Sequence, residues 1–519
     1  MTTTPTPSPR LLVIGIDGGS FDTIDPAAAS GELPNLSRLL ADSASSRTTC
    51  TWPAHTAPGW STFVSASHPG GHGIFQFFDT QDAGYGARTT QSSDLGRSSV
   101  WEWMAAQDWT LGLINIPMSH PAADLPGYQV TWPLQRTLRH CRPPGLLREL
   151  ASAGAHFQSD LATMFTGDMG YLEEAEANVA ARVRSVRHLM TAYPTDAVMV
   201  VLTEADRVGH HYWHYTDPGH PRHEEAVDRG WDQAMARVYR AIDEAVGELL
   251  ALVDDDTTVV LVSDHGLGQG RYGLAVHRLL EDAGLLTTAP GDYPGDGVAS
   301  WFAEGGQHID FRRTQLYMPV PGSNGLNVNQ RGRQLAGKVS TRDRERVVAE
   351  AVELLSGLLT PEGMPVFDAV LPREEAYPGP LVHRAPDVLL RPAAETVLVT
   401  SELTGDPWRP SIQTGLHRHE GIWAQRSPRT VPGRRSGTVP LVNVVPTMLT
   451  DLGLAWPTDV HGSPQPGVLD EPHAGLTPAS ASALENLLRP RADELAEGAY
   501  RPADEDTRTS ETLRTMGYL

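Results

Sequence analysis

Three short segments of the chain consist almost entirely of apolar residues, and each ends in a polar cluster. They cover residues 11–16, 197–202 and 258–262. Runs of this kind are typical of strands that are buried on both faces of a parallel sheet. Between them, the spacing of apolar residues predicts helices over 171–193 and 223–253. This alternation predicts an α/β fold with a mostly parallel central sheet flanked by helices.

Chemically active side chains gather just beyond the ends of these predicted strands. Asp17 follows the first strand, Asp206 lies shortly after the second, and Asp264 and His265 follow the third. Open parallel sheets bind their ligands outside the carboxyl ends of the strands. We therefore expect these residues to share one site.

The candidate site residues extend from Asp17 to His417, so dividing the chain into independent domains would split the site. We expect one core over residues 10–455, with cap insertions at about 80–190 and 270–410. Residues 1–9 are rich in Thr and Pro and are expected to be flexible. The Pro- and Gly-rich stretch after residue 456 predicts a linker, followed by a C-terminal tail with short helices at 480–488 and 492–497.

Composition excludes several classes of function. The 41 basic and 63 acidic residues give a net charge of −22, which argues against binding to a nucleic acid polymer or an anionic membrane surface. Lys338 is the only lysine and no Ser or Thr follows it, so a P-loop is excluded. Two cysteines cannot form a disulfide framework or a Cys-rich zinc module. With no apolar run of about 18 residues and no signal-like segment, we expect a cytoplasmic location.

Metal binding is the chemistry that these residues suit best. Asp206 and His210 are one helical turn apart, and Asp264 is followed directly by His265. Together with Asp17 they supply ligands suited to Zn²⁺ or Mn²⁺. A further histidine comes from residues 415–419, where His417 and His419 compete. His211 and His214 compete in the same way with His210.

A hydroxyl nucleophile would complete such a site. Two metal ions about 3.5 to 4 Å apart can clamp an in-line phosphoryl displacement and activate the attacking oxygen. Thr56 lies where a loop is expected to lead into a helix, and the N-terminus of a helix offers free N–H groups to a phosphate. Ser61 and Thr62 are the alternatives, and a simple N-cap role is the structural alternative for Thr56.

Six motifs in this order resemble the alkaline phosphatase superfamily, and most closely the type I phosphodiesterase/nucleotide pyrophosphatase family. The resemblance covers residues 11 to about 455. It also includes residues 444–449, which resemble the helix that closes the core in this superfamily. The motifs are Ile16-Asp17-Gly18-Gly19, Thr56-Ala57-Pro58-Gly59-Trp60, Pro69-x2-His72-Gly73-Ile74, Asp206-Arg207-Val208-Gly209-His210, Ser263-Asp264-His265-Gly266 and Gly415-x-His417.

The resemblance implies a site with two divalent metal ions, zinc first and manganese as the alternative. One ion would be held by Asp17, Asp264 and His265 with the Thr56 oxygen, and the other by Asp206, His210 and His417. Thr56 would attack phosphorus, and a metal-bound hydroxide would then hydrolyse the phospho-threonine. The expected substrate is a small phosphodiester or a nucleotide conjugate.

Other activities on the same fold remain alternatives. They are a phosphomonoesterase, a phosphoryl transferase and a metal-binding relative without catalysis. No Lys or Arg lies within residues 53–73, which favours diesters or pyrophosphates over the more highly charged monoesters. A sulfatase is disfavoured because the segment that begins at Cys50 does not match C-x-P-x-R. Asn115 and Asn327 are expected to be structural, and Arg331 and Arg333 are unranked candidates for contact with the leaving group.

Overall fold

The structure is a computed structural model, and it describes most of the chain. The described residues are 8–81, 83–132, 141–155, 170–224, 227–293, 301–393, 396–470 and 484. The helices expected at 480–488 and 492–497 lie outside them, apart from Leu484.

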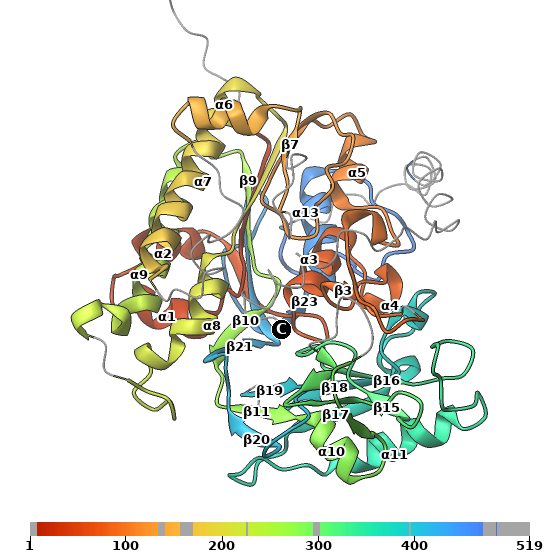
Figure 1. Cartoon of the computed structure of the whole chain (residues 1–519). Coiled ribbons are helices and arrows are strands. Elements are labelled where there is room, and N and C mark those ends of the chain that lie inside the picture. The colour runs from red at the N-terminus through yellow and green to blue at the C-terminus, as the bar shows by residue number, and fades with distance from the viewer. Residues whose placement is uncertain are drawn as a thin grey trace, which may run out of the picture.

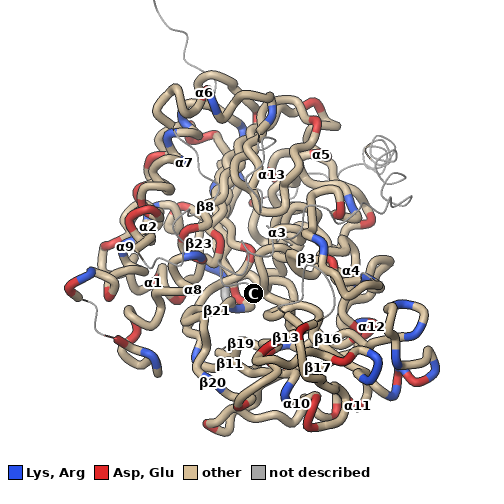
Figure 2. Tube along the Cα trace, in the orientation of Figure 1, with Lys and Arg blue, Asp and Glu red and all other residues tan. Residues whose placement is uncertain are grey.

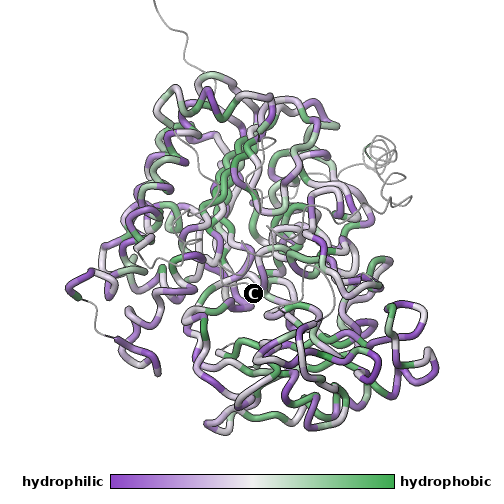
Figure 3. The backbone as a smooth tube through the Cα atoms, in the orientation of Figure 1, coloured by the Kyte–Doolittle hydropathy of each residue, from purple (hydrophilic) through white to green (hydrophobic). Residues whose placement is uncertain are grey.

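The three apolar segments form the centre of a nine-stranded sheet, with the bounds that the sequence predicts. β1 (Leu11–Ile16) pairs in parallel with β8 (Ala197–Leu202) on one side and with β9 (Thr258–Val262) on the other. Every residue of these strands is buried, as their continuous apolar sequences require. Figure 3 shows them as a hydrophobic spine through the core, and Figure 2 shows that they carry no charged residues.

The remaining strands extend the sheet on both sides, in the order β23-β2-β22-β9-β1-β8-β5-β6-β7. β5 is parallel to β8 and to β6, and β2 is parallel to β23, whereas β22 and β7 are antiparallel to their neighbours. The sheet is therefore mostly parallel, as predicted. It includes β5, β6 and β7, which belong to the segment 80–190 that we expected in a cap. The bounds are β2 (Ala44–Thr49), β5 (Leu111–Ile114), β6 (Gly127–Val130), β7 (Cys141–Arg142), β22 (Glu420–Arg426) and β23 (Gly433–Pro440).

Helices cover both faces of this sheet (Figure 1). One face carries α1 (Phe21–Ala29), α2 (Pro34–Ala41), α7 (Leu172–Ala192), α8 (Glu204–Thr216) and α9 (Ala234–Leu250). The other carries α3 (Thr56–Ser65), α4 (Pro69–His72), α5 (Val100–Ala105) and α13 (Val444–Leu452). α6 (Leu146–Ser152) lies at the end of the sheet that is uppermost in Figure 1.

The two predicted helices differ in how well their bounds agree with the structure. α7 matches the prediction over 171–193 to within one residue at each end. The helix predicted over 223–253 begins only at Ala234, after two short 3₁₀ turns. Gly230 separates those turns with a φ of 68°, a left-handed conformation that an α-helix cannot include.

A smaller lobe lies beyond the carboxyl ends of the central strands (Figure 1). The chain leaves the core after β10 (Gly266–Gln269) and returns at β21 (Gly415–Arg418), and these two strands pair with each other. The lobe contains three small sheets, of order β19-β11-β20, β12-β14-β13 and β15-β16-β18-β17, with helices α10 (Val276–Asp282), α11 (Arg344–Ser356) and α12 (Arg373–Ala376). Its strands are β11 (Tyr272–Ala275), β12 (Thr288–Pro290), β13 (Ala303–Glu304), β14 (Gln307–Ile309), β15 (Leu316–Tyr317), β16 (Gly325–Val328), β17 (Phe367–Pro372), β18 (Val388–Pro392), β19 (Val397–Thr400) and β20 (Trp408–Pro410). A short hairpin of β3 (Phe78–Asp79) and β4 (Arg88–Thr89) lies beside the core.

Among the helices that the structure describes, none is long and apolar enough to span a membrane.

Candidate active site

The seven predicted site residues lie together at the carboxyl ends of the central strands. Asp17 follows β1, Asp264 and His265 follow β9, and Asp206 and His210 lie on α8, which follows β8. Thr56 is the first residue of α3, and His417 lies on β21. Six of them are at most 1% exposed, and the His417 side chain is 11% exposed.

The first half of this cluster surrounds the Thr56 hydroxyl. His265 Nε2 lies 3.2 Å from Asp264 Oδ2 and 3.6 Å from Asp17 Oδ1. Thr56 Oγ1 lies 3.5 Å from Asp17 Oδ1 and 3.4 Å from His265 Nε2. One carboxylate oxygen from each aspartate and one nitrogen of His265 are near enough to one another to bind a single ion.

The second half is centred on Asp206. Its Oδ1 lies 3.2 Å from His210 Nε2 and 3.2 Å from His417 Nε2, and the two nitrogens are 3.1 Å apart. The rings of His417 and His265 are tilted against each other with centroids 3.8 Å apart. Asp206, His265 and His417 also form a compact group, so the two halves adjoin at His265.

The three histidines of the cluster share one tautomer. Nδ1 of His210, His265 and His417 lies 2.8, 3.0 and 2.9 Å from the carbonyl oxygens of Gly415, Gly266 and Ala54, respectively. Because a carbonyl only accepts hydrogen bonds, each Nδ1 carries the proton and each Nε2 presents a lone pair to the cluster. Two facing lone pairs 3.1 Å apart repel each other unless a cation lies between them. Two ligands on a tetrahedral zinc ion, with bonds of 2.0 to 2.1 Å, are about 3.3 Å apart.

The carboxylates also require positive charge. Burial, together with the nearby charges of Asp17 and Asp206, raises the pKa of Asp264 well above its ordinary value. No described residue donates a hydrogen bond to Asp264 Oδ2, which is buried. The donor set therefore fits divalent metal ions.

Close packing around the cluster holds it in place. Trp60 Nε1 on α3 donates a hydrogen bond of 3.0 Å to Asp17 Oδ2. A Cβ atom at Gly59 would lie only 2.9 Å from the Asp264 Cβ, so this glycine allows α3 to approach the end of β9. A Cβ at Gly415 would lie 2.3 Å from the backbone oxygen of Gly209, so this glycine allows β21 to approach α8. The glycines of two motifs thus set the separation between ligand-bearing elements.

The structure places the competing residues elsewhere. His214 Nδ1 lies 3.0 Å from the Thr414 hydroxyl, and His419 Nδ1 lies 3.7 Å from Cys50 Sγ. His210, His211, His214 and His419 all lie outside the two candidate metal-binding groups among the described residues, but His210 Nε2 lies 3.2 Å from Asp206 Oδ1. Of the three candidate hydroxyls, Thr56 contacts the cluster, whereas Thr62 Oγ1 lies 3.0 Å from His72 Nε2.

The other polar candidates have structural partners. The Asn115 amide donates to the backbone oxygen of Val201, at 3.0 Å, and the Asn327 amide donates to that of Thr80, at 3.4 Å. Arg333 is paired with Asp387 in the smaller lobe.

One residue of the site, His55, was not singled out by the sequence analysis. It is the N-cap of α3, and its Nδ1 accepts a hydrogen bond of 3.3 Å from the Ala57 N–H. Its ring centroid lies 5.6 Å from that of His417 and 4.8 Å from that of Phe77, and its side chain is partly exposed. Histidine is not among the residues preferred at N-caps, so its position directly before Thr56 was an available signal.

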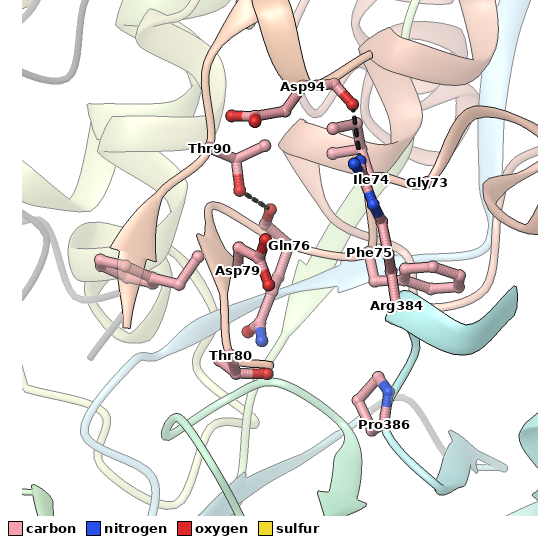
Figure 4. Close-up of a pocket in the computed structure, with 11 residues that line it drawn as sticks. Gly73, Ile74, Phe75, Gln76, Asp79, Thr80, Thr90, Asp94, Arg384 and Pro386 are labelled. Carbon is pink, nitrogen blue, oxygen red and sulfur yellow. Dashed lines mark hydrogen bonds between the residues drawn. The ribbon is translucent and has the colours of Figure 1, made fainter. Parts of the chain in front are cut away.

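A separate hollow lies where the smaller lobe meets the core (Figure 4). Arg384 of the lobe donates from Nη1 to the backbone oxygen of Asp94, at 2.9 Å. The Thr90 hydroxyl donates to the backbone oxygen of Gln76, at 3.2 Å. None of the seven cluster residues lines this hollow, so it belongs to the contact between the lobes.

One known protein family matches most of the chain. The profile of the type I phosphodiesterase / nucleotide pyrophosphatase family matches residues 11–421, which is most of the chain. The chain belongs to this family. The family lies within the alkaline phosphatase superfamily, so both the resemblance and the fold predicted from the motifs are confirmed. A search of curated proteins finds no match.

Two solved structures share the fold of this family member. Phosphonoacetate hydrolase from Sinorhizobium meliloti 1021, in complex with phosphonoacetate, is 14% identical and has a TM-score of 0.53. The match covers 85% of this chain and 95% of that one. An inactive form of murine ectonucleotide pyrophosphatase / phosphodiesterase 5, in complex with AMP, is 13% identical and has a TM-score of 0.50, with coverage of 86% and 96%.

Proposed function

We propose that this family member hydrolyses phosphodiester or nucleotide pyrophosphate bonds, with Thr56 as the nucleophile. It would use two divalent metal ions, with zinc as the first candidate. The observation that carries the proposal is the position of the Thr56 hydroxyl, 3.5 Å from Asp17 and 3.4 Å from His265 at the N-terminus of α3. Asp17, Asp264 and His265 would hold one ion with Thr56. Asp206, His210 and His417 would hold the other.

The chain's residues prepare Thr56 for attack on phosphorus. When bound, the two ions lower the pKa of the threonine hydroxyl and offset the negative charge of the phosphoryl oxygens. The Thr56 hydroxyl gives up its proton as its oxygen forms a new bond to phosphorus. The bond from phosphorus to the leaving-group oxygen breaks, and the leaving oxygen takes up a proton. Water then hydrolyses the phospho-threonine, which returns the threonine hydroxyl and releases the phosphoryl product. The burial of Thr56 limits the access of water before substrate arrives.

The charges around the site favour a substrate with a single negative charge on the reacting phosphoryl group. Arg207 is the arginine that lies against the described cluster, and its Nη1 is 3.4 Å from Asp206 Oδ2. It is 1% exposed and already faces a carboxylate, so it has little charge to offer a phosphate dianion. This supports a phosphodiester or a pyrophosphate over a monoester. The complexes of the two similar structures, with phosphonoacetate and with AMP, support a small-molecule substrate.

The test combines elemental analysis with turnover. We expect nearly two zinc or manganese ions per chain. We also expect cleavage of bis-p-nitrophenyl phosphate or of members of a nucleotide-sugar panel, with slower cleavage of p-nitrophenyl phosphate. Thr56→Ala should lower kcat by at least about 1,000-fold while leaving the metal content near that of the unmodified protein.

Ser61→Ala is the matched control. Ser61 lies on the same helix and is equally buried, and its hydroxyl has no hydrogen-bond partner among the described residues. Its loss should leave both turnover and metal content unchanged. Full diester turnover by Thr56→Ala would overturn the proposed nucleophile, and a preparation without metal or turnover after incubation with zinc and manganese would overturn the hydrolase.

A further inference from the structure

The four imidazoles around Thr56 are of two kinds. His210, His265 and His417 place Nδ1 against carbonyl oxygens and direct Nε2 lone pairs into the cluster. His55 does the reverse, because its Nδ1 accepts the N–H of Ala57. An Nδ1 that accepts a hydrogen bond carries no proton, so the ring proton of neutral His55 is on Nε2. His55 is therefore the hydrogen-bond donor in a group whose other imidazoles are metal ligands or acceptors.

Contacts with three of the described residues help to fix the orientation of the His55 ring. The cap to Ala57 N holds Nδ1 at the first turn of α3, so Nε2, across the ring, points away from the helix backbone. The rings of Phe77 and His55 form a T-shaped pair, and Phe77 also stacks on Trp132 with centroids 5.6 Å apart. His417 meets it edge-on from the side of the metal-binding cluster. Turning the ring over would break the cap, so the position of the Nε2–H is set before a substrate binds.

His55 also lies on the open side of the site. His417 and His55 both have exposed surface, whereas Thr56 is completely buried. A phosphoryl group that approaches Thr56 from this exposed side meets these two rings.

We propose that His55 is a catalytic residue whose Nε2–H donates a hydrogen bond to a non-bridging oxygen of the phosphoryl group that Thr56 attacks. This inference rests on the proposed function. A donor that is in place beforehand stabilises the charge that develops on that oxygen in the transition state, and it need not reorganise during the reaction. A neutral imidazole does so without adding a cation beside two metal ions. One residue then caps α3, and so positions Thr56, and also binds the group that Thr56 attacks.

His55→Asn tests this role, because asparagine is among the best N-cap residues and keeps an acceptor for the first turn of α3 while removing the ring. We expect kcat with bis-p-nitrophenyl phosphate to fall about 100-fold, the size typical of losing one such donor. Metal content and thermal unfolding temperature should stay near those of the unmodified protein. His383→Asn, at an exposed position in the smaller lobe, is the control and should change none of these quantities.

The leaving group decides which oxygen His55 contacts. Across aryl phosphodiesters whose phenols differ in pKa, the loss in His55→Asn should be nearly constant, because a non-bridging oxygen is common to all of them. A loss that grows as the leaving group becomes poorer would place the donor on the leaving oxygen and overturn the assignment. Unchanged kcat, or a fall in kcat matched by loss of metal, would overturn the role altogether.

A binding measurement separates this inference from the proposed function. Inorganic phosphate is titrated calorimetrically into metal-loaded Thr56→Ala and into the double variant Thr56→Ala/His55→Asn. We expect the dissociation constant to be about tenfold higher in the double variant, which corresponds to one hydrogen bond to a charged group. Equal dissociation constants would overturn the role of His55 even if the enzyme hydrolyses diesters. A tenfold difference would support it even if the substrate panel gave no turnover.

Discussion

Two regions of the molecule bury carboxylates, and they balance that charge in different ways. In the smaller lobe, Asp387 is fully buried, and its oxygens lie 2.9 Å from Arg344 and 3.6 Å from Arg373, with Arg333 in direct contact. Its Oδ2 also accepts a 2.8 Å hydrogen bond from the Val328 N–H. At the ends of the central strands, three aspartates meet three histidines whose lone pairs face them.

The pKa shifts of Asp387 and Asp264 have opposite signs. Burial acts to raise the pKa of Asp387, but the hydrogen bonds and charges of the arginines outweigh it and hold that pKa below its ordinary value. The pKa of Asp264 is raised by burial and by two further carboxylates. A buried carboxylate with its own cations is part of the architecture, whereas one surrounded by like charge is poised to bind a cation from solution. The contrast between Asp387 and Asp264 therefore predicts a structural role for the first and a role in cation binding for the second.

Among the tests of this comparison, we expect the largest change, in metal affinity and turnover, from Asp264→Asn. This nearly isosteric change removes one charge from the candidate metal site. We expect metal affinity to fall by more than about 100-fold, beyond the loss typical of residues that only support a ligand, and turnover to fall with it. The unfolding temperature of the metal-free protein should stay the same or rise, because the repulsion from Asp17 and Asp206 is relieved. A large loss of stability in the metal-free protein would show that Asp264 is structural.

Asp387→Asn should have the opposite profile. Three arginines lose their common partner, and breaking a buried ion pair from one side costs 3 to 5 kcal/mol. Because the three arginines are 13 to 20% exposed, we expect the free energy of unfolding to fall by about 3 kcal/mol. Urea unfolding followed by tryptophan fluorescence measures this change, and elemental analysis should find the metal content unchanged. If Asp387→Asn instead lost its metal and kept its stability, Asp387 would be the carboxylate needed for metal binding.

The smallest effect is a pH dependence of the metal-free protein. Asp264 has a raised pKa when folded, so above its ordinary pKa of 3.8 the folded state keeps a proton that the unfolded state releases. The resulting stability is present below pH 3.8 and is lost as the pH rises through the folded pKa. Between pH 3.8 and the folded pKa of Asp264, the unfolding free energy of the unmodified protein should therefore fall relative to that of Asp264→Asn. The expected fall is about 1.4 kcal/mol per pH unit. A flat difference would contradict the raised pKa, and zinc should abolish the slope by replacing the proton.

Sequence patterns predicted the parts of the fold that carry strong local signals. β1, β8 and β9 were found with their observed bounds because strands buried on both faces are continuously apolar. β2 was missed because its sequence, Ala-Ser-Ser-Arg-Thr-Thr, has no apolar run, although its backbone pairs with β22 and β23. β5 and β6 have only four residues each, too short for a recognisable period. Their place in the sheet depends on pairing with segments remote in sequence.

The candidate site was predictable to a similar extent. The seven cluster residues could be named because each stands in a motif at a strand end or a helix start. Their assignment to two ions remains a prediction. The role of His55 could not be predicted, because it depends on a tautomer set by one cap hydrogen bond and on the packing of Phe77 and His417. The Asp387 cluster was equally hidden, because Arg333, Arg344 and Arg373 converge from separate segments.

The pairing of β10 with β21 has a consequence for how far the smaller lobe can vary independently of the candidate site. Gln269 faces Gly415 in this ladder, and the Gly270 N–H donates to the Thr414 oxygen at 2.7 Å, so the smaller lobe begins and ends at neighbouring points of the core. In topological terms the lobe is the long connection of a β-hairpin. The first strand of this hairpin, β10, begins directly after His265, and the second, β21, contains His417. Recombination can therefore exchange the lobe as a unit, with no change in the backbone that bears these two side chains. The hairpin thus separates the backbone of the candidate site from the lobe above it.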